Sequence, residues 1–172
     1  MASLLAILGY LLGFLLFIAG IPALMWWASG RPLFWVPSLL PAAIAAVLIV
    51  LGLAISIRAI IYMKKVGEGN PFDAYGHEVA PRTRHLMTSG PYRRSRNPML
   101  LGVYIYDLGL MLWLLSWWPL AIFAAEALLL TLQVRSEEKR LETDFGEEYL
   151  AYKRRVPRYL FDSTRFFSIF VR

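Results

Sequence analysis

The sequence predicts an all-α integral membrane protein with four transmembrane helices, arranged as two hairpins, and a cytoplasmic amphipathic helix near the C-terminus. Hydrophobic residues make up 58% of the 172 residues, more than one soluble core of this length can bury. Apolar stretches of membrane-spanning length recur along the chain. The 18 Lys and Arg residues gather mainly in two segments beside these stretches, as they do in multi-pass membrane proteins.

Four stretches are expected to cross the bilayer. Residues 4–28 and 33–57 each form a run of 25 residues without a charge, enough for a hydrocarbon core of about 30 Å. Residues 99–118 and 119–134 contain one ionisable residue each, with a turn expected at residues 116–118. We therefore expect one domain with four parts: an N-terminal hairpin (1–63), a loop (64–97), a second hairpin (98–136) and a tail (137–172).

The positions of the charged residues predict the orientation in the membrane. Seven Lys and Arg residues lie in residues 64–96 and nine in residues 135–172. Because basic segments stay in the cytoplasm, both segments and both chain termini are expected on that side. The tryptophans fall at the opposite ends of the spans and predict an aromatic belt there: Trp26, Trp27, Trp35, Trp113, Trp117 and Trp118.

The composition excludes several classes of site. The net charge of +6 lies beside the spans, which indicates attraction to anionic lipid head groups and argues against nucleic-acid binding. Without cysteine, the chain has no disulfide, zinc-thiolate site or thiol nucleophile. The two histidines, His77 and His85, have poor spacing for a metal site, so no metal is expected.

The tail is expected to begin with an amphipathic surface helix that ends near Pro157. Its apolar residues follow helical spacing, with charged residues between them: Leu141, Phe145, Tyr149, Tyr152 and Val156. Residues 158–172 mix Arg with Phe and Ile, a composition typical of an interfacial anchor.

The stretch SGPYRRSRNPML joins strong positive charge to a predicted helix start. Asn97 can cap this helix, and Pro98 is tolerated at its first position because no hydrogen bond is lost there. The free amides of a helix N-terminus then lie close to Arg93, Arg94 and Arg96. The sequence therefore predicts an anion site at this helix start.

Glu137 and Glu138 follow the last span, and a tight hairpin would place them beside Asn97. Such a pocket offers donors for a carboxylate and acceptors for an amine or a ribose diol. It would suit a zwitterionic ligand. Aromatic rings expected around it could hold a cation by their faces: Tyr92, Tyr104, Tyr149 and Tyr152.

Two motifs carry a resemblance to a known family. The stretch GPYRRSRNPMLLG is followed, one hairpin later, by RSEEKRLETDFGEEYLAYKRRVP. Over residues 64–158 the chain resembles the isoprenylcysteine carboxyl methyltransferases and the related phospholipid methyltransferases. The resemblance implies an integral-membrane methyltransferase that uses S-adenosylmethionine. The cofactor would bind between the second hairpin and the C-terminal segment, open to the cytoplasm, and a lipophilic acceptor would enter from the lipid bilayer.

The resemblance also implies roles for individual residues. The carboxyl methyltransferases have His where this chain has Asn97, which can form hydrogen bonds but cannot titrate. This difference moves the expected acceptor away from isoprenylcysteine itself. The residues expected to bind the cofactor are Gly90, Pro91, Tyr92, Arg96, Asn97, Pro98, Gly102, Glu137, Glu138 and Tyr149.

Arg135 and Glu138 are the expected catalytic residues. We expect Arg135 to orient an acceptor anion, while Glu138 or Glu137 binds the ammonium or ribose of the cofactor and the Asn97 helix start binds its carboxylate. A carboxylate acceptor, as in a prenylated cysteine-like compound, needs no base. A lipid amine must be neutral to react, and one of the glutamates could take its proton. Carboxylate, amine and hydroxyl acceptors all stay open.

Asp107 and Glu126 are the ionisable residues inside the second hairpin. Counted from the turn, they lie ten and nine residues into their helices, so we expect both near mid-bilayer. We favour a shared proton or hydrogen-bonded pair that locks the hairpin, although Asp107 could instead line a substrate tunnel. The expected substrate-binding residues are Tyr104, Asp107, Glu126 and Tyr152.

Two other functions remain open. An NADPH-dependent membrane reductase would bind a nucleotide diphosphate in the same basic pocket. A non-enzymatic membrane scaffold or small transporter would use Asp107 and Glu126 as its pathway. Cofactor preference separates the methyltransferase from the reductase, and specific binding of either cofactor disfavours the scaffold.

Overall fold

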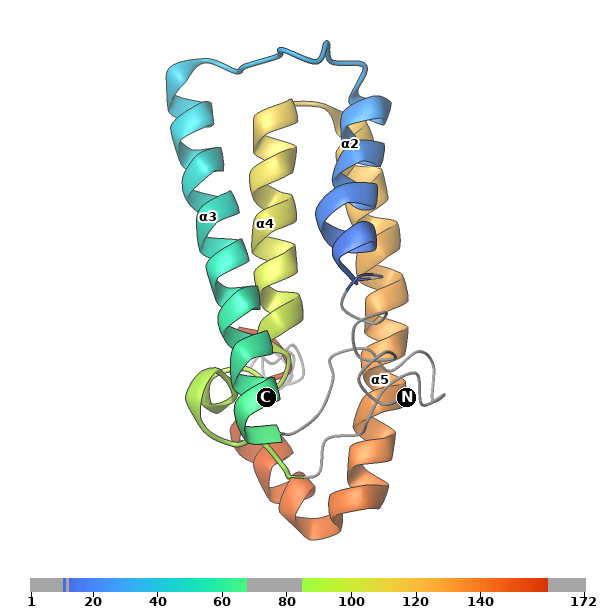
Figure 1. Cartoon of the computed structure of the whole chain (residues 1–172). Coiled ribbons are helices and arrows are strands. Elements are labelled where there is room, and N and C mark those ends of the chain that lie inside the picture. The colour runs from blue at the N-terminus through green and yellow to red at the C-terminus, as the bar shows by residue number, and fades with distance from the viewer. Residues whose placement is uncertain (1–10, 12, 68–84, 161–172) are drawn as a thin grey trace, which may run out of the picture.

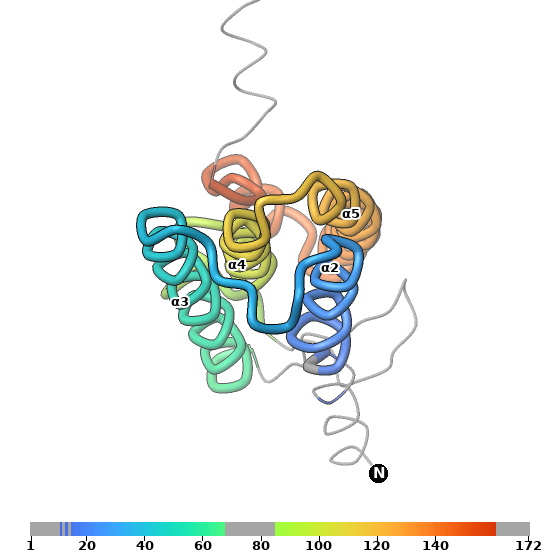
Figure 2. Tube along the Cα trace, turned by 90° about the horizontal axis from the view of Figure 1, so that it is seen from above, coloured from blue at the N-terminus to red at the C-terminus, as the bar shows by residue number. Residues whose placement is uncertain are grey.

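The computed structural model describes residues 11, 13–67 and 85–160, which form helices and no β-strand. The predicted all-α fold is thus confirmed for these residues. Figure 1 shows the long helices running along one common axis, and Figure 2 shows α3 beside α4 and α2 beside α5. In chain order the elements are η1 (Phe14–Gly20), α2 (Ile21–Ser29), α3 (Leu39–Tyr62), η2 (Met63–Gly67), η3 (Gly90–Arg93), α4 (Pro98–Leu114) and α5 (Trp117–Arg155).

Two helices are long and apolar enough to cross a membrane. They are Leu39–Gly67, with 29 residues, and Trp117–Arg155, with 39 residues; the first overlaps residues 39–57 of the second predicted span, and the other contains the fourth. The apolar helices Leu15–Ser29 and Pro98–Leu114 are shorter. Two of the four predicted spans therefore correspond to helices that are long and apolar enough to cross a membrane, and the arrangement of four spans stays a prediction. Residues 1–10 and 12, which belong to the first predicted span, lie outside the described residues.

Small residues bring α3 and α4 into close contact. A Cβ atom at Gly102 would lie 2.5 Å from the carbonyl oxygen of Gly52, and one at Gly109 would lie 2.9 Å from the carbonyl oxygen of Ala45. Ser56 donates a hydrogen bond across the same interface to the carbonyl of Met99, at 2.8 Å. Packing through small residues and interhelical hydrogen bonds is the usual way in which membrane helices associate.

The connection between α4 and α5 lies one residue earlier than predicted. Leu115, with φ 47° and ψ 49°, is left-handed, and its N–H donates to the carbonyl of Met111 at 3.0 Å, which ends α4. The turn therefore comprises Leu115 and Ser116. Arg31 donates to the carbonyls of Leu114 and Leu115, each at 2.9 Å, and so joins the α2–α3 connection to this turn.

Helix α5 contains a reversal where the sequence predicts the start of a separate surface helix. The predicted separate surface helix is instead continuous with the last span as far as Gly146, whose φ of 50° and ψ of −126° are not helical. Figure 1 shows the chain turning back at this end of α5. Lys153 pairs with Glu142 at 2.5 Å across the reversal. We call residues 117–145 the first arm of α5 and residues 147–155 its second arm.

The predicted apolar stripe of the tail is confirmed as one cluster. Its buried members are Tyr149, Tyr152 and Val156, and Leu141 and Phe145 pack against them. Because Gly146 separates these two groups, the stripe closes the angle between the arms of α5. Most of the predicted interfacial anchor, residues 161–172, lies outside the described residues.

Candidate functional site

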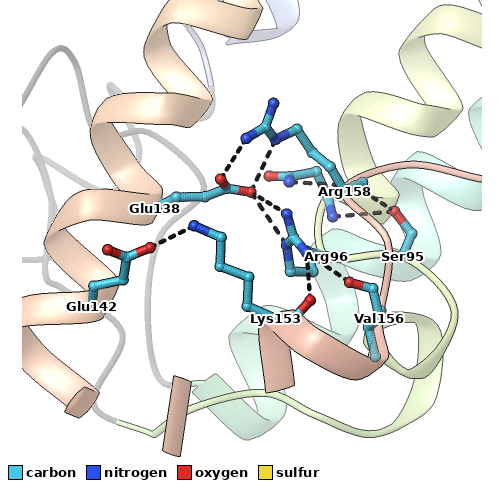
Figure 3. Close-up of polar contacts among 8 residues, drawn as sticks. Ser95, Arg96, Glu138, Glu142, Lys153, Val156 and Arg158 are labelled. Carbon is cyan, nitrogen blue, oxygen red and sulfur yellow. Dashed lines mark hydrogen bonds and ion pairs between the residues drawn. The ribbon is translucent and has the colours of Figure 1, made fainter. Parts of the chain in front are cut away.

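The charged residues of both motifs meet where α4 begins. Figure 3 shows Arg96 from the start of α4, Glu138 from the first arm of α5 and Arg158 from the segment after α5. That segment is held to the start of α4 by backbone bonds. The N–H of Arg96 donates to the carbonyl of Pro157 at 2.9 Å, and the N–H of Asn97 donates to the carbonyl of Arg158 at 3.1 Å. The predicted proximity of the helix start and the glutamates is therefore present.

Glu138 lies at the centre of this cluster. Its Oε1 accepts from Nη2 of Arg96 at 2.8 Å and from Nε of Arg158 at 3.0 Å, and its Oε2 accepts from Nη2 of Arg158 at 2.6 Å. Only 6% of the side-chain surface of Glu138 is exposed. Burial acts to raise the pKa of Glu138, but the hydrogen bonds from Arg158 and Arg96 outweigh it and lower that pKa.

This geometry changes the role expected for Glu138. Both of its oxygens are engaged by guanidinium groups, so the predicted contact with a cofactor ammonium would require an ion pair to open. The two arginines and one carboxylate together carry one excess positive charge. The cluster is thus suited to an anionic group, and we call Arg96, Glu138 and Arg158 the arginine clamp.

Arg96 also fixes the end of the second arm. Its Nη1 donates to the carbonyls of Lys153 at 3.0 Å and Val156 at 2.7 Å. These carbonyls lie at a helix C-terminus, where a cation is favourable. Arg96 therefore connects the start of α4 to both arms of α5.

Asn97 occupies the predicted N-cap position, but its side chain does not cap α4. The expectation of a capping hydrogen bond is wrong because the backbone ψ of 63° turns the residue toward the segment after α5. Its Nδ2 lies 3.4 Å from the carbonyl oxygen of Arg158, which also accepts from Oγ of buried Ser95 at 3.0 Å. Asn97 thus helps to hold Arg158.

Glu137 is the glutamate that remains accessible, with 38% of its side-chain surface exposed. Among the described residues, its ion-pair partner is Nη2 of Arg140, at 4.0 Å. The surrounding protein groups desolvate the carboxyl and, together with the negative charge of Glu138, raise the pKa of Glu137 to about 7. Glu137 is therefore better placed than Glu138 to meet a cationic group.

Three of the predicted aromatic residues are buried beside the clamp. Tyr152 donates to the carbonyl of Tyr92 at 2.7 Å, and the rings of Tyr149 and Tyr152 lie 6.1 Å apart. The hydroxyl of Tyr92 is buried and has no hydrogen-bond partner among the described residues. Burial, followed by the charge of Glu137, raises the pKa of Tyr92, so this hydroxyl stays neutral and can donate to a ligand.

The glycines and prolines of the first motif shape the backbone. Gly90 has a φ of 59°, and a Cβ atom there would lie 2.5 Å from the ring of Tyr62. Pro91 and Pro98 lie in the first turns of η3 and α4. Gly102 faces α3, which gives it a packing role. Their contacts with a cofactor stay predictions.

Arg135 is exposed and forms no ion pair with another described residue. It lies at the junction between the apolar part of α5 and the charged part that contains Glu138. Its side chain is therefore available to an acceptor anion, and its catalytic role stays a prediction.

The predicted substrate-binding residues separate into two groups. Tyr104, Asp107 and Glu126 lie within the apolar part of α4 and α5, where Tyr104 is edge-on to Phe123 at 5.7 Å. Tyr152 is instead buried in the cluster beside the second arm. The reversal at Gly146 turns Tyr152 toward Tyr92, and the substrate-binding roles of all four residues stay predictions.

Sequence reasoning missed Arg158, Ser95 and Tyr159. Arg158 completes the clamp, Ser95 binds the Arg158 carbonyl, and Tyr159 lies 3.4 Å from the hydroxyl of Tyr104. None of these contacts follows from spacing along one helix, because each joins residues at least 20 positions apart. Gly146, the glycine in FGEEY, was the one residue in the sequence that could have indicated a reversal in this helix.

Comparison with known proteins supports the resemblance carried by the motifs. A family model described as phospholipid methyltransferase matches residues 40–148, which include α3, α4 and the first arm of α5. No curated protein and no solved structure gives a significant match. The family match covers more than half of the chain, so the protein belongs to the phospholipid methyltransferase family, whose members are membrane methyltransferases.

Proposed function

We propose that the protein is an S-adenosylmethionine-dependent methyltransferase that acts on a lipophilic acceptor. The observation that carries the proposal is the pairing of a net-positive arginine clamp with an accessible Glu137. A zwitterionic amino acid group needs this combination of charges. The family supports methyl transfer, and the unpartnered hydroxyl of Tyr92 offers a further donor.

S-adenosylmethionine would supply an electrophilic methyl group bound to a sulfonium. Arg96 and Arg158 would bind its carboxylate through the positive charge that Glu138 leaves unneutralised. Glu137 would bind its ammonium, and Tyr92 would donate to a remaining oxygen acceptor. Burial of the clamp excludes water and strengthens these interactions.

The acceptor could react in two ways. Arg135 would orient a carboxylate, as in a prenylated cysteine-like compound, and no base would be needed. A lipid amine or hydroxyl would give up a proton. Glu137 could receive it in place of its contact with the cofactor ammonium, because desolvation and the charge of Glu138 raise its pKa to about 7 in the protein without cofactor. Asn97 cannot take part in proton transfer.

Equilibrium binding of S-adenosylmethionine and of NADPH to the detergent-purified protein tests the proposal. We expect S-adenosylmethionine to bind and NADPH not to compete. Glu137→Gln removes the charge that meets the ammonium and should weaken binding about tenfold. Arg135→Ala and the exposed control Glu147→Gln should bind the cofactor like the wild type.

Preferential binding of NADPH would replace this proposal with a reductase. Binding of neither cofactor by the folded wild type would remove the enzymatic assignment. Equal weakening by Glu137→Gln and Glu147→Gln would show that the position assigned to the ammonium is wrong.

A further inference from the structure

Asp107 on α4 and Glu126 on the first arm of α5 form a buried carboxyl pair that the proposed cofactor site does not use. Asp107 is 0% exposed and Glu126 is 7% exposed. The two carboxyl groups lie close enough to act on each other. Apart from the hydrogen bond that one carboxyl group can donate to the other when protonated, none of their four oxygens has a hydrogen-bond partner among the described residues.

No protein cation compensates the pair within the apolar part of the second hairpin, because residues 98–134 contain no Lys, Arg or His. Arg31, at the turn, is already bonded to the carbonyls of Leu114 and Leu115. A proton shared between the two carboxyl groups would satisfy two of the four oxygens. With a single shared proton, two acceptor oxygens would still lack a donor, which is costly in an apolar interior.

The pair is too far from the arginine clamp to contact the group that is methylated. Ten residues of α4 separate Asp107 from Asn97, which corresponds to about 15 Å at the rise of an α-helix. Tyr104 lies between these levels, packed against Phe123 and Tyr159 at ring distances of 5.7 and 5.3 Å. The level between the clamp and the pair is therefore lined by aromatic rings, which suit an apolar chain.

We propose that Asp107 and Glu126 form a specificity-determining subsite for a hydrogen-bond donor, a hydroxyl or an N–H, carried within the lipophilic chain of the acceptor. This inference rests on the proposed function, since it assumes a lipophilic acceptor whose reacting end lies near Arg135, at the same end of the helices as the clamp. The donor would complete the hydrogen bonds that the two carboxyl groups lack. Lipids with an unbroken hydrocarbon chain would leave those oxygens unsatisfied.

Three matched fatty acids test the subsite without need of the cofactor. Binding of 12-hydroxyoctadecanoic, 2-hydroxyoctadecanoic and octadecanoic acid to the detergent-purified full chain is measured by thermal unfolding and by competition. We expect the mid-chain hydroxyl to improve affinity about tenfold over the unsubstituted acid. The hydroxyl beside the carboxylate should give no such gain because it cannot reach the pair.

Asp107→Leu combined with Glu126→Met removes the pair while keeping the apolar volume similar. Such replacements of buried charged groups are often neutral or stabilising, so the variant should fold. It should bind the mid-chain hydroxy acid and octadecanoic acid equally. The control Glu147→Gln removes an exposed carboxylate outside the apolar part and should keep the tenfold preference.

Equal binding of all three acids by the wild type would overturn the inference and leave the pair as a lock between α4 and α5. A preference that survives in the double variant, or one that 2-hydroxyoctadecanoic acid shares, would also overturn it. S-adenosylmethionine binding, measured on the same preparations, reports on the proposed function separately.

Discussion

Glu138 holds together three segments that are distant in the sequence. Its two partners are Arg96 and Arg158, and Arg96 is as thoroughly buried as Glu138 itself. Because hydrogen bonds from the guanidinium groups lower the pKa of Glu138, ionisation contributes stability in full above the ordinary pKa of 4.5. That contribution is lost as the pH falls through the lowered pKa.

Replacing Glu138 should therefore be far more costly than replacing a neighbouring glutamate. Glu138→Gln leaves two guanidinium groups without a counter-charge and should lower the free energy of unfolding by about 3 kcal/mol. Glu142→Gln removes a partly exposed pair with Lys153 and should cost less than about 1 kcal/mol. Denaturant unfolding in detergent measures both. If both variants lost the same free energy of unfolding, Glu138 would not have the central structural role assigned to it in the arginine clamp.

The contribution of Glu137 to stability should depend on pH in the opposite direction to that of Glu138. Desolvation and the charge of Glu138 raise its pKa to about 7, so the folded protein binds this proton more tightly than the unfolded chain does. Its contribution to stability is present in full below pH 4.5 and is lost as the pH rises toward and through about 7.

The melting temperature of the wild type minus that of Glu137→Gln should thus decrease between pH 4.5 and about 7. The difference removes the pH dependence of every other group, because Gln does not titrate. A difference that is constant across this range would show that Glu137 has an ordinary pKa in the folded protein.

At the scale of elements, Gly146 determines where the second arm of α5 goes. Its φ of 50° lies in the left-handed region, and its ψ of −126° is far from helical, a combination essentially restricted to glycine. A Cβ atom at this position would meet nothing within 4 Å. The requirement for glycine is therefore conformational and not steric.

Gly146→Ala should lower the free energy of unfolding by about 2 kcal/mol through backbone strain alone. It should also weaken cofactor binding, because the second arm positions the segment that contains Arg158. Thr143→Ala, an exposed helical position of the first arm, is the matched control and should change neither quantity by more than about 0.5 kcal/mol. If Gly146→Ala left both the free energy of unfolding and cofactor binding unchanged, residue 146 would not have the left-handed backbone conformation that the reversal requires.

The elements also show what the sequence could and could not predict. The apolar runs were sufficient to predict α3 and the first arm of α5, because helix length and hydropathy are local properties of the sequence. The spacing from Leu141 to Val156 identified the correct apolar cluster. It could not place Gly146 as the reversal, because one glycine is compatible with a helix until tertiary contacts favour another conformation.

At the scale of the whole molecule, the two ends of the bundle are joined by different chemistry. Arg31 bonds to neutral carbonyls at the α4–α5 turn and stacks on Trp35, 4.0 Å away. The opposite end is joined by the charged arginine clamp. The sequence predicted that the helix start at Asn97 and the end that contains Glu137 are neighbours, because a hairpin brings its two ends together. The contact of Arg158 with Glu138 was not predicted, because the chain brings Arg158 back to the first arm of α5 only through the reversal at Gly146.

The reversal also has a consequence for the order in which the protein matures. The chain is synthesised from its N-terminus, so α3, α4 and the first arm of α5 exist before residues 147–158 emerge. The final partner of Glu138 is therefore added last, to helices that are already complete. A ribosome that stops shortly before Pro157 would release a helical bundle that can enter a membrane but holds an unclosed site. Quality control that senses apolar helices alone would not distinguish this product from the finished protein.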